Sequence, residues 1–466
     1  MEYYVGYDIG TTNLKCLLLA ENGTIEKVIK ESTPKIQYKS HLFFDLKKIE
    51  SFVDNTLESL SSFYNVKSVG FSSVGETIVP IKEHKVICNP PLWDEKEITS
   101  TKEEREIIES LAPSQAIGTL TKPLFSIHKI LWMKREIIGV KDADLFLPLS
   151  SYFVYRKTGL PFWDYSQASR SGVFDIRTKK WIEPLLDYFS IVLPSLILPM
   201  GHEGGKCDNI YYGIGGHDHI VGFYGIEKSL QEENKSLYYS SMGTSEVLAT
   251  LVNENKIENF VPSAKGYLQP SFFPKKYTAT RSFRSFGSML ESIRTITSYN
   301  DDYAKMNEDI SNLTSTEPAC LFSSNGDFIQ ASNDTDWLNI YKIKRGCKRE
   351  EIIESAYLYL SVLSEIMRCD LENQYNLNKD GIFVVGGGIT KNKTFLSYLS
   401  SAITQPVLLL NTEEISALGA ALVGQNVVSS HSIKIKHIEV EKNIKFERLI
   451  KETVKRYKEL VWRKSI

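Results

Sequence analysis

Two segments of this sequence, one at its start and one just past its midpoint, follow the same pattern. When the numbering is shifted by 233, the Gly-Thr-Thr at 10–12 aligns with the Gly-Thr-Ser at 243–245, and the apolar positions after each turn also coincide. Each segment is predicted to form a strand, a tight turn and a second strand. Because the shift is far longer than a solenoid repeat, the pattern indicates two domains built on one plan. We expect the boundary between 233 and 234, in the polar stretch QEENK.

Helical and strand-like segments alternate in both halves, which predicts an α/β fold. In the first half we expect a helix over 42–63, a strand over 66–71 and a helix over 126–138. The apolar face of the first of these helices consists of Leu46, Ile49, Phe52, Val53, Leu57 and Leu60. In the second half we expect a buried strand over 381–385, and helices over 392–404, 416–423 and 446–462. The small residues of 416–423 allow that helix to lie close to another backbone.

Composition excludes several classes of protein. The chain has 466 residues, and 55 Lys and Arg against 57 Asp and Glu give a net charge of −2, so nothing favours a nucleic-acid or membrane-surface partner. The six cysteines include no CxxC pair, and we expect reduced thiols. The start of the chain lacks a signal-peptide pattern, and the apolar stretch at 191–199 is far shorter than the ~20 residues that span a bilayer. We therefore expect a soluble cytoplasmic protein.

The octet DIGTTNLK at 8–15 combines features of a phosphate site. Gly10 allows a tight turn, after which backbone N–H groups and hydroxyls are able to hold phosphate oxygens. Asp8 ends a strand at the turn, where a carboxylate can hold Mg²⁺ through waters, and Lys15 would offset phosphate charge. From these residues alone, an ordinary Thr-rich hairpin explains the octet equally well.

Two further glycine-containing segments lie in the second half. Gly243 and Thr244 repeat the first turn, and two such turns facing each other across a cleft suit an ATP tail. The strand before 386 runs into three glycines, where backbone would be able to lie against a ring or a phosphate. No Gly-Lys-Ser/Thr follows, so the segment is not a P-loop, and simple loop flexibility remains the alternative.

The stretch GIGGHDHIVG at 213–222 places a histidine on either side of an aspartate. Three consecutive side chains are expected to bind one metal ion poorly, and neither an HExxH helix nor a Cys pair accompanies them. Asp218 precedes an apolar stretch that is predicted to be helical, so it is either the cap of that helix or a general base directed into a cleft. His217 and His219 would orient the turn or contact a substrate.

The order of these motifs resembles that of the FGGY carbohydrate kinases, which include the glycerol, xylulose and gluconate kinases. The chain has DxGTTxxK at its start, GGHDH in the middle, GTSE soon after, and GGG followed by Asn and EISALGAAL near its end. Residues 126–136 are similar to the family's P-x-x-K-hydrophobic-x-W segment, and 164–177 to its DYS-x-ASR and FDI signature. The resemblance covers nearly the whole chain.

The resemblance implies two actin-like (ribonuclease H-like) domains with ATP and a sugar in the cleft between them. Residues 1–233 would carry the sugar and the catalytic base, and 234–466 the nucleotide. Asp218 matches the catalytic base, and Asp8 the acidic residue near Mg²⁺. The positions that match nucleotide-binding segments are Gly10, Thr11, Thr12 and Lys15 in the first phosphate loop, Gly243 and Thr244 in the second, Gly287 in a further turn, and Gly387, Gly388 and Asn392 at the adenosine. The segments that line the sugar pocket in relatives contain Glu76, Thr77 and Trp93.

The expected reaction is ATP-dependent phosphorylation of a small sugar or polyol, in first place a pentulose or hexulose and in second place glycerol or another polyol. Departures from the family leave the substrate open: Leu124 stands where glycerol kinases have a Tyr, Gly75 where they have an Arg, and SNGDFI at 324–329 replaces a Gly-Glu-Arg-x-Pro loop. Two rival classes remain: a nucleotide switch of the actin or chaperone type without a sugar pocket, and a metal hydrolase built on His217, Asp218 and His219. A homodimer is left open.

Overall fold

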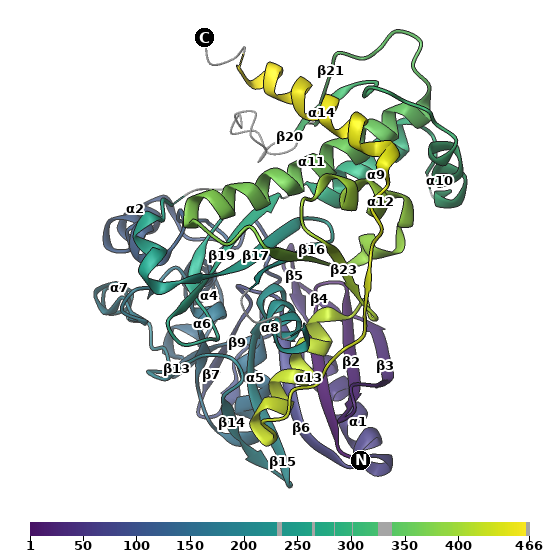
Figure 1. Cartoon of the computed structure of the whole chain (residues 1–466). Coiled ribbons are helices and arrows are strands. Elements are labelled where there is room, and N and C mark those ends of the chain that lie inside the picture. The colour runs from purple at the N-terminus through teal and green to yellow at the C-terminus, as the bar shows by residue number, and fades with distance from the viewer. Residues whose placement is uncertain (231–234, 263–265, 284, 301, 325–337, 463–466) are drawn as a thin grey trace.

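The computed structural model describes residues 1–230, 235–262, 266–283, 285–300, 302–324 and 338–462 (Figure 1). The predicted domain boundary at 233/234 and most of the loop at 324–329 therefore lie outside the described residues, and both stay predictions.

A mixed sheet forms the centre of the first half. Its strand order is β14-β15-β6-β1-β2-β3. The strands β1, β2 and β3 run antiparallel in sequence, whereas β6 pairs parallel to β1 and β15 pairs parallel to β6. The bounds are β1 Tyr3–Ile9, β2 Asn13–Ala20, β3 Ile25–Ser32, β6 Val66–Ser73, β14 Glu203–Cys207 and β15 Ile210–His217.

A second mixed sheet repeats this plan in the second half. Its order is β18-β19-β17-β16-β22-β23-β24. As in the first sheet, an antiparallel hairpin (β16 and β17) continues into a further antiparallel strand (β19), and two parallel strands (β22 and β23) lie beyond β16. The bounds are β16 Ser236–Met242, β17 Glu246–Asn253, β18 Leu268–Pro270, β19 Lys276–Phe283, β22 Gly381–Gly386, β23 Val407–Leu410 and β24 His437–Glu439. The prediction of two α/β halves built alike is confirmed.

Helices flank both sheets, and Figure 1 shows α9, α10, α11, α12 and α14 gathered in the upper part of the molecule. The main helices are α1 Leu46–Phe63, α4 Ser126–Glu136, α5 Leu149–Thr158, α8 Asp218–Leu230, α9 Phe286–Ile296, α10 Tyr303–Ser311, α11 Arg349–Tyr375, α12 Lys393–Ala402, α13 Ile415–Val428 and α14 Ile444–Trp462. Among the described residues, no helix combines the length and the apolar character needed to cross a membrane.

Helix α13 lies between β23 and β24 of the second sheet in sequence but packs on the first sheet, against β1, β6, β15 and α8 (Figure 1). At two positions of these strands, the helix backbone lies so close that no side chain fits, and both positions are glycine. A Cβ on Gly6 would lie 1.9 Å from the carbonyl oxygen of Ala417, and one on Gly70 would lie 2.1 Å from that of Ala420. The small-residue helix predicted over 416–423 thus joins the two halves of the molecule.

The predicted helix over 42–63 is wrong at its start. Residues His41–Phe44 form strand β5, which pairs with β4 (Lys35–Tyr38), and α1 begins only at Leu46. The side chain of Asp45 accepts a hydrogen bond from the backbone N–H of Lys48 and caps the helix, which fixes this boundary. The six apolar residues expected on one face of this helix are all buried.

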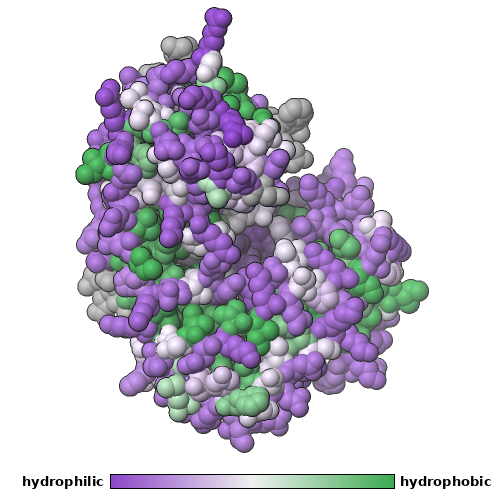
Figure 2. All heavy atoms as spheres, turned by 90° about the vertical axis from the view of Figure 1, so that its right-hand side faces the viewer, coloured by the Kyte–Doolittle hydropathy of each residue, from purple (hydrophilic) through white to green (hydrophobic). Residues whose placement is uncertain are grey.

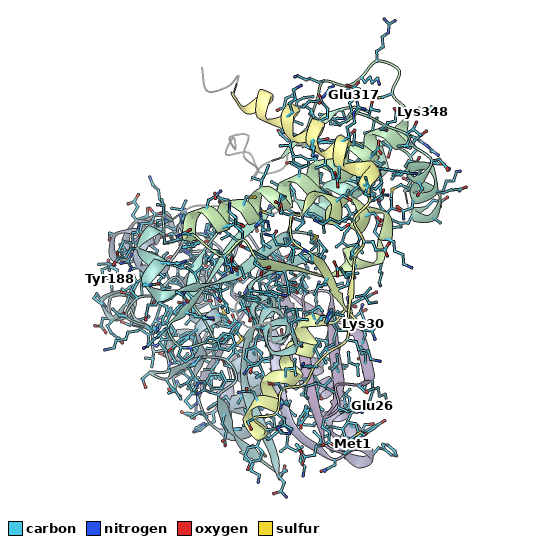
Figure 3. All side chains as sticks on the ribbon, viewed as in Figure 1. Met1, Glu26, Lys30, Tyr188, Glu317 and Lys348 are labelled. Atoms are coloured by element: carbon cyan, nitrogen blue, oxygen red, sulfur yellow. The ribbon has the colours of Figure 1, made fainter. Side chains whose placement is uncertain are left out.

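The face of the molecule drawn in Figure 2 is mostly polar, and it is hollowed where the upper and lower parts of the molecule meet. At the free edge of the first sheet, β3 is rich in charged residues, including Glu26 and Lys30 (Figure 3). Charges on an edge strand oppose pairing with another chain.

Candidate functional site

The first Gly-Thr turn joins β1 to β2. The N–H of Gly10 donates to the carbonyl of Asn13 at 3.1 Å, and the hydroxyl of Thr33 donates to the carbonyl of Gly10 at 2.7 Å. Thr11 is half-buried and Thr12 is exposed. These hydrogen bonds hold the turn from behind and leave the side chain of Thr12 exposed, as a phosphate-binding turn allows.

Asp8 and Lys15 face each other across the strands that lead into this turn. They are direct partners in the antiparallel register, and Lys15 Nζ lies 3.3 Å from Asp8 Oδ2. The hydroxyl of Ser72 donates to Asp8 at 3.1 Å, and Lys15 also pairs with Glu414 at 2.6 Å. Burial raises the pKa of Asp8, which Lys15 and Ser72 partly oppose. A buried, oriented carboxylate of this kind fits Mg²⁺ bound to a nucleotide.

Burial disfavours the charge of Lys15, but its two acidic partners outweigh this and raise the pKa of the lysine. Lys15 therefore remains protonated at neutral pH. Glu414, the residue just before α13, was not predicted to belong to the site. Because α13 crosses to the first sheet, this carboxylate connects the second half of the chain to the first phosphate turn.

Glu76 lies on the loop after β6, in a left-handed conformation with φ of 56° that is uncommon for a residue other than glycine. Its side chain is 3% exposed and forms an ion pair with Arg170, whose Nε donates at 2.6 Å. The guanidinium of Arg170 lies over the rings of both Phe125 and Tyr267, 5.2 Å from each ring centroid. This clamp fixes the Glu76 carboxylate.

Arg170 and Tyr267 were missed as site residues, although Arg170 stands in the DYS-x-ASR segment. Its pairing with Glu76 depends on a contact across 94 residues of chain, which no local pattern indicates.

The two other residues predicted to bind sugar lie in different surroundings. Trp93 is partly buried, and its indole N–H donates to the hydroxyl of Thr11 at 2.8 Å, so it connects the sugar side to the first phosphate turn. Thr77 is fully buried, and its hydroxyl lies 3.4 Å from the carbonyl oxygen of Pro91. In this structure Thr77 supports the loop that carries Glu76.

Asp218 is the first residue of α8, directly after the last residue of β15. Its Oδ1 lies 3.4 Å from His217 Nε2 and 3.7 Å from His219 Nε2, and it accepts the backbone N–H of His219 at 2.7 Å. Burial alone would raise the pKa of Asp218, but the two imidazoles, this N–H and Lys15 outweigh burial and lower it. Asp218 is therefore ionised at neutral pH, as a general base requires.

The two histidines are anchored to different halves. The backbone N–H of His217 donates to the hydroxyl of Ser166 at 2.9 Å, while Nδ1 of His219 lies 3.1 Å from the hydroxyl of Ser241 on β16. Burial lowers the pKa of His217 to about 4, so this ring is neutral at physiological pH. Through His219 and Ser241, Asp218 is connected to the strand that leads into the second Gly-Thr turn.

The sequence predicts that three consecutive side chains bind one ion poorly, and this stays a prediction, but the structure brings their ligand atoms close together. One ligand atom each from His217, Asp218 and His219 lie within 4.8 Å of one another. The reason is local: the chain changes from strand to helix between 217 and 218, and the change in backbone direction turns neighbouring side chains to the same side.

The glycines predicted to bind nucleotide gather around the second turn. The N–H of Gly287 donates to the carbonyl of Thr244 at 2.9 Å, and a Cβ on Gly287 would lie 2.5 Å from the carbonyl oxygen of Gly243. Gly387 has a φ of 94°, and a Cβ there would lie 2.3 Å from the carbonyl oxygen of Met242, the residue before the turn. Gly388 has open space around it. The second turn thus exposes backbone groups that a nucleotide phosphate can contact, and the space around Gly388 leaves room for the nucleotide.

Asn392 serves as the cap of α12. Its side-chain oxygen accepts the N–H of Phe395 at 3.0 Å, and its amide nitrogen donates to the hydroxyl of Tyr357 at 2.7 Å. Both polar atoms are thus engaged within the protein, and a role of Asn392 at the adenosine stays a prediction.

Comparison with known proteins finds similar sequences and similar folds. Residues 3–209 match the model of the N-terminal domain of the FGGY family of carbohydrate kinases. The xylulose kinase of Staphylococcus xylosus is 24% identical over 462 residues, which cover 91% of this chain and 90% of the relative.

Two solved structures share the fold over nearly their whole length. The ligand-bound xylulose kinase of Lactobacillus acidophilus superposes with a TM-score of 0.80 at 18% identity, over 99% of this chain and 98% of the other. The glycerol kinase of Plasmodium falciparum with ADP gives a TM-score of 0.80 at 18% identity, over 100% of this chain and 99% of the other.

Proposed function

The chain belongs to the FGGY family of carbohydrate kinases, and we propose that it transfers the terminal phosphoryl group of ATP to a hydroxyl of a pentulose or hexulose. Its curated relatives include both xylulose and glycerol kinases, so the choice of substrate depends on this chain's own residues.

The position of Asp218 is the observation that carries the proposal. Its carboxylate stands at the start of α8, flanked by two imidazoles, and the helix N-terminus adds to the stabilisation of its negative charge. The carbonyl of the same residue accepts the hydroxyl of Ser416 at 3.2 Å, next to the helix start that carries Glu414. Asp218 thus lies where the elements bearing both Gly-Thr turns meet.

In the proposed reaction, Asp218 accepts the proton of the attacking hydroxyl, a role worth about 10²–10⁴ in rate. Glu76, held by Arg170, accepts hydrogen bonds from other hydroxyls of the sugar. The two Gly-Thr turns hold the phosphates, so catalysis depends on position and charge rather than on a covalent intermediate.

Asp8 and Lys15 form the charged part of the nucleotide side. Bound Mg²⁺ neutralises charge on the phosphates as it builds up. Asp8 would hold that ion, directly or through water, and Lys15 keeps the buried carboxylate oriented. The threonines at 11 and 12 extend the same surface with hydroxyl donors.

Glu76 supports a second candidate substrate, glycerol or another polyol. Glycerol kinases are similar to this chain in the Glu-Thr at 76–77, but this chain has Gly75 before it. A Cβ on Gly75 would lie 2.9 Å from the ring of His217, so that ring occupies the space into which a larger residue would project. This chain therefore lacks the Arg of the glycerol kinases at that position, and glycerol stays the second candidate.

An ADP-release assay over glycerol, tetritols, pentuloses, hexuloses and gluconate tests the proposal. We expect MgATP consumption to rise with one or more ketoses and the product to be a sugar phosphate. If no sugar or polyol stimulated ATP consumption, the nucleotide-switch interpretation would replace the enzyme. Stimulation by glycerol alone would make the second candidate correct.

A further inference from the structure

The side chains at the end of β15 and the start of α8 form a set of metal-ligand atoms that phosphoryl transfer itself does not require. We propose that His217, Asp218 and His219 form a binding site for a divalent transition-metal ion, best matched by Zn²⁺ and distinct from the Mg²⁺ at Asp8. Occupation of this site switches the enzyme off, because the ion binds the carboxylate that serves as the base; this consequence rests on the proposed function, whereas the binding itself does not.

The spacing of the ligand atoms carries the inference. Zn²⁺ binds imidazole nitrogen and carboxylate oxygen at about 2.0–2.2 Å in tetrahedral sites, which places neighbouring ligand atoms roughly 3.3–3.5 Å apart. Asp218 Oδ1 already lies 3.4 Å from His217 Nε2 and 3.7 Å from His219 Nε2, and the three atoms lie within 4.8 Å of one another. A small movement of the more exposed His219 ring completes the triangle.

Both rings are held with Nε2 toward the carboxylate. The hydroxyl of Ser241 occupies Nδ1 of His219 at 3.1 Å, an outer contact of the kind that fixes metal-binding histidines. The His217 ring packs on Gly75, and its own Nδ1 is buried without a hydrogen-bond partner in the described part of the chain. Packing therefore sets the orientation of His217, and a hydrogen bond sets that of His219.

The donor set selects the ion. Two nitrogens and one oxygen suit Zn²⁺ and other borderline metals, whereas Mg²⁺ prefers an all-oxygen octahedron with several waters. The three side chains are 10%, 25% and 28% exposed, so an ion has access. Three protein ligands leave a fourth position for water or a substrate hydroxyl, as in open zinc sites.

Titration of the chelator-stripped, full-length protein with Co²⁺ tests the site, because Co²⁺ in a tetrahedral site absorbs strongly in the visible and Zn²⁺ displaces it. We expect one equivalent to produce the band in the wild type. Each of His217→Asn and His219→Asn should weaken binding by more than about 100-fold, and Ser241→Ala by about 10-fold, as removal of an outer partner does. The exposed His202→Asn is the matched control and should bind like the wild type.

A missing band, or equal Co²⁺ affinity in wild type and His219→Asn, would overturn the site. In the kinase assay, free Zn²⁺ at the concentration that fills the site should abolish turnover, and a chelator should restore it. Unchanged turnover with the site filled would overturn the inhibition. Should no substrate be phosphorylated at all, the proposed function fails, while the titration still decides whether the metal binds.

Discussion

The two Gly-Thr turns share a backbone plan and differ in the side chains around them. Asp8 and Lys15 flank the first turn and form an ion pair, whereas the matching positions at the second turn hold Ser241 and Leu248. Gly287 packs against the backbone of the second turn, and because it has no side chain, it places none over that turn.

The loop after β6 in the first half and the loop after β22 in the second half also differ in the charge that they carry. Glu76 follows β6 with a φ of 56°, and Gly387 follows β22 with a φ of 94°. The first half thus carries a charged side chain where the second has bare backbone. One duplicated plan therefore has a charged turn in the first half and a turn without such charges in the second; we propose that the first serves the metal and the hydroxyl and the second the nucleotide.

The largest difference between the halves should follow from removing the charge at the first turn. We expect Asp8→Asn to lower turnover by about 100-fold or more, because the carboxylate that holds Mg²⁺ is lost. Burial already raises the pKa of Asp8, so a neutral amide should fold well. Steady-state kinetics against the exposed control Asp187→Asn measures the effect, and equal turnover in both would remove Asp8 from the metal site.

Arg170 tests whether the charged half also selects the sugar. Arg170→Lys retains the charge but loses the two-pronged contact and the aromatic stacking, so we expect the KM for the sugar to rise about tenfold while the KM for ATP stays near that of the wild type. Arg170→Met leaves Glu76 buried and unpaired, and should lose both sugar binding and thermal stability. A rise in both KM values in the lysine variant would mean that Arg170 only supports the fold.

The neutral half should respond in the opposite way. We expect Gly287→Ala to raise the KM for ATP several-fold and leave the KM for the sugar unchanged, because its Cβ would lie 2.5 Å from the carbonyl oxygen of Gly243. Ser288→Ala on the same helix is the control, since this side chain is exposed. If the sugar KM changed as much as the ATP KM, the division of labour between the turns would be wrong.

The fourth expected effect is on stability rather than on kinetics. Glu246 follows the second turn, is fully buried, and accepts hydrogen bonds from Ser240 and Ser364; burial raises its pKa to about 7. A raised pKa means that the folded state favours the proton, so the wild type loses stability as pH rises from about 4.5 to about 7. Glu246→Gln should therefore be more stable than wild type at pH 8, by up to about 3 kcal/mol, and equal to it at pH 4.

Thermal unfolding at both pH values measures this difference. The corresponding position in the first half is the partly exposed Asn13, whose replacement by Ala should give no such pH-dependent difference. A stability gap for Glu246→Gln that is the same at pH 4 and pH 8 would contradict the raised pKa.

Much of the fold was predictable because it depends on local patterns. Both hairpins, the buried face of α1 and the helix after Asp218 follow from periodicity and from glycine positions. The start of α1 was misjudged because Leu42 and Phe43 fit a helical period as well as a strand, and the cap at Asp45 decides between them.

The contacts that build the site were mostly invisible in the sequence. Lys15 pairs with Glu414 because α13 crosses to the first sheet. Glu76 pairs with Arg170, which lies 94 residues away in the sequence. The convergence of His217 and His219 on Asp218 depends on the angle between β15 and α8. Residue types indicated candidates, and only the fold shows which of them touch.

The central claim is that Asp218 is the base that activates the sugar hydroxyl between these two unlike halves. The most direct test is the ADP-release rate of Asp218→Asn with the best substrate, alongside ATP binding measured separately. We expect ATP to bind as in the wild type and turnover to fall by about 10²–10⁴-fold. Turnover close to that of the wild type would show that another group accepts the proton.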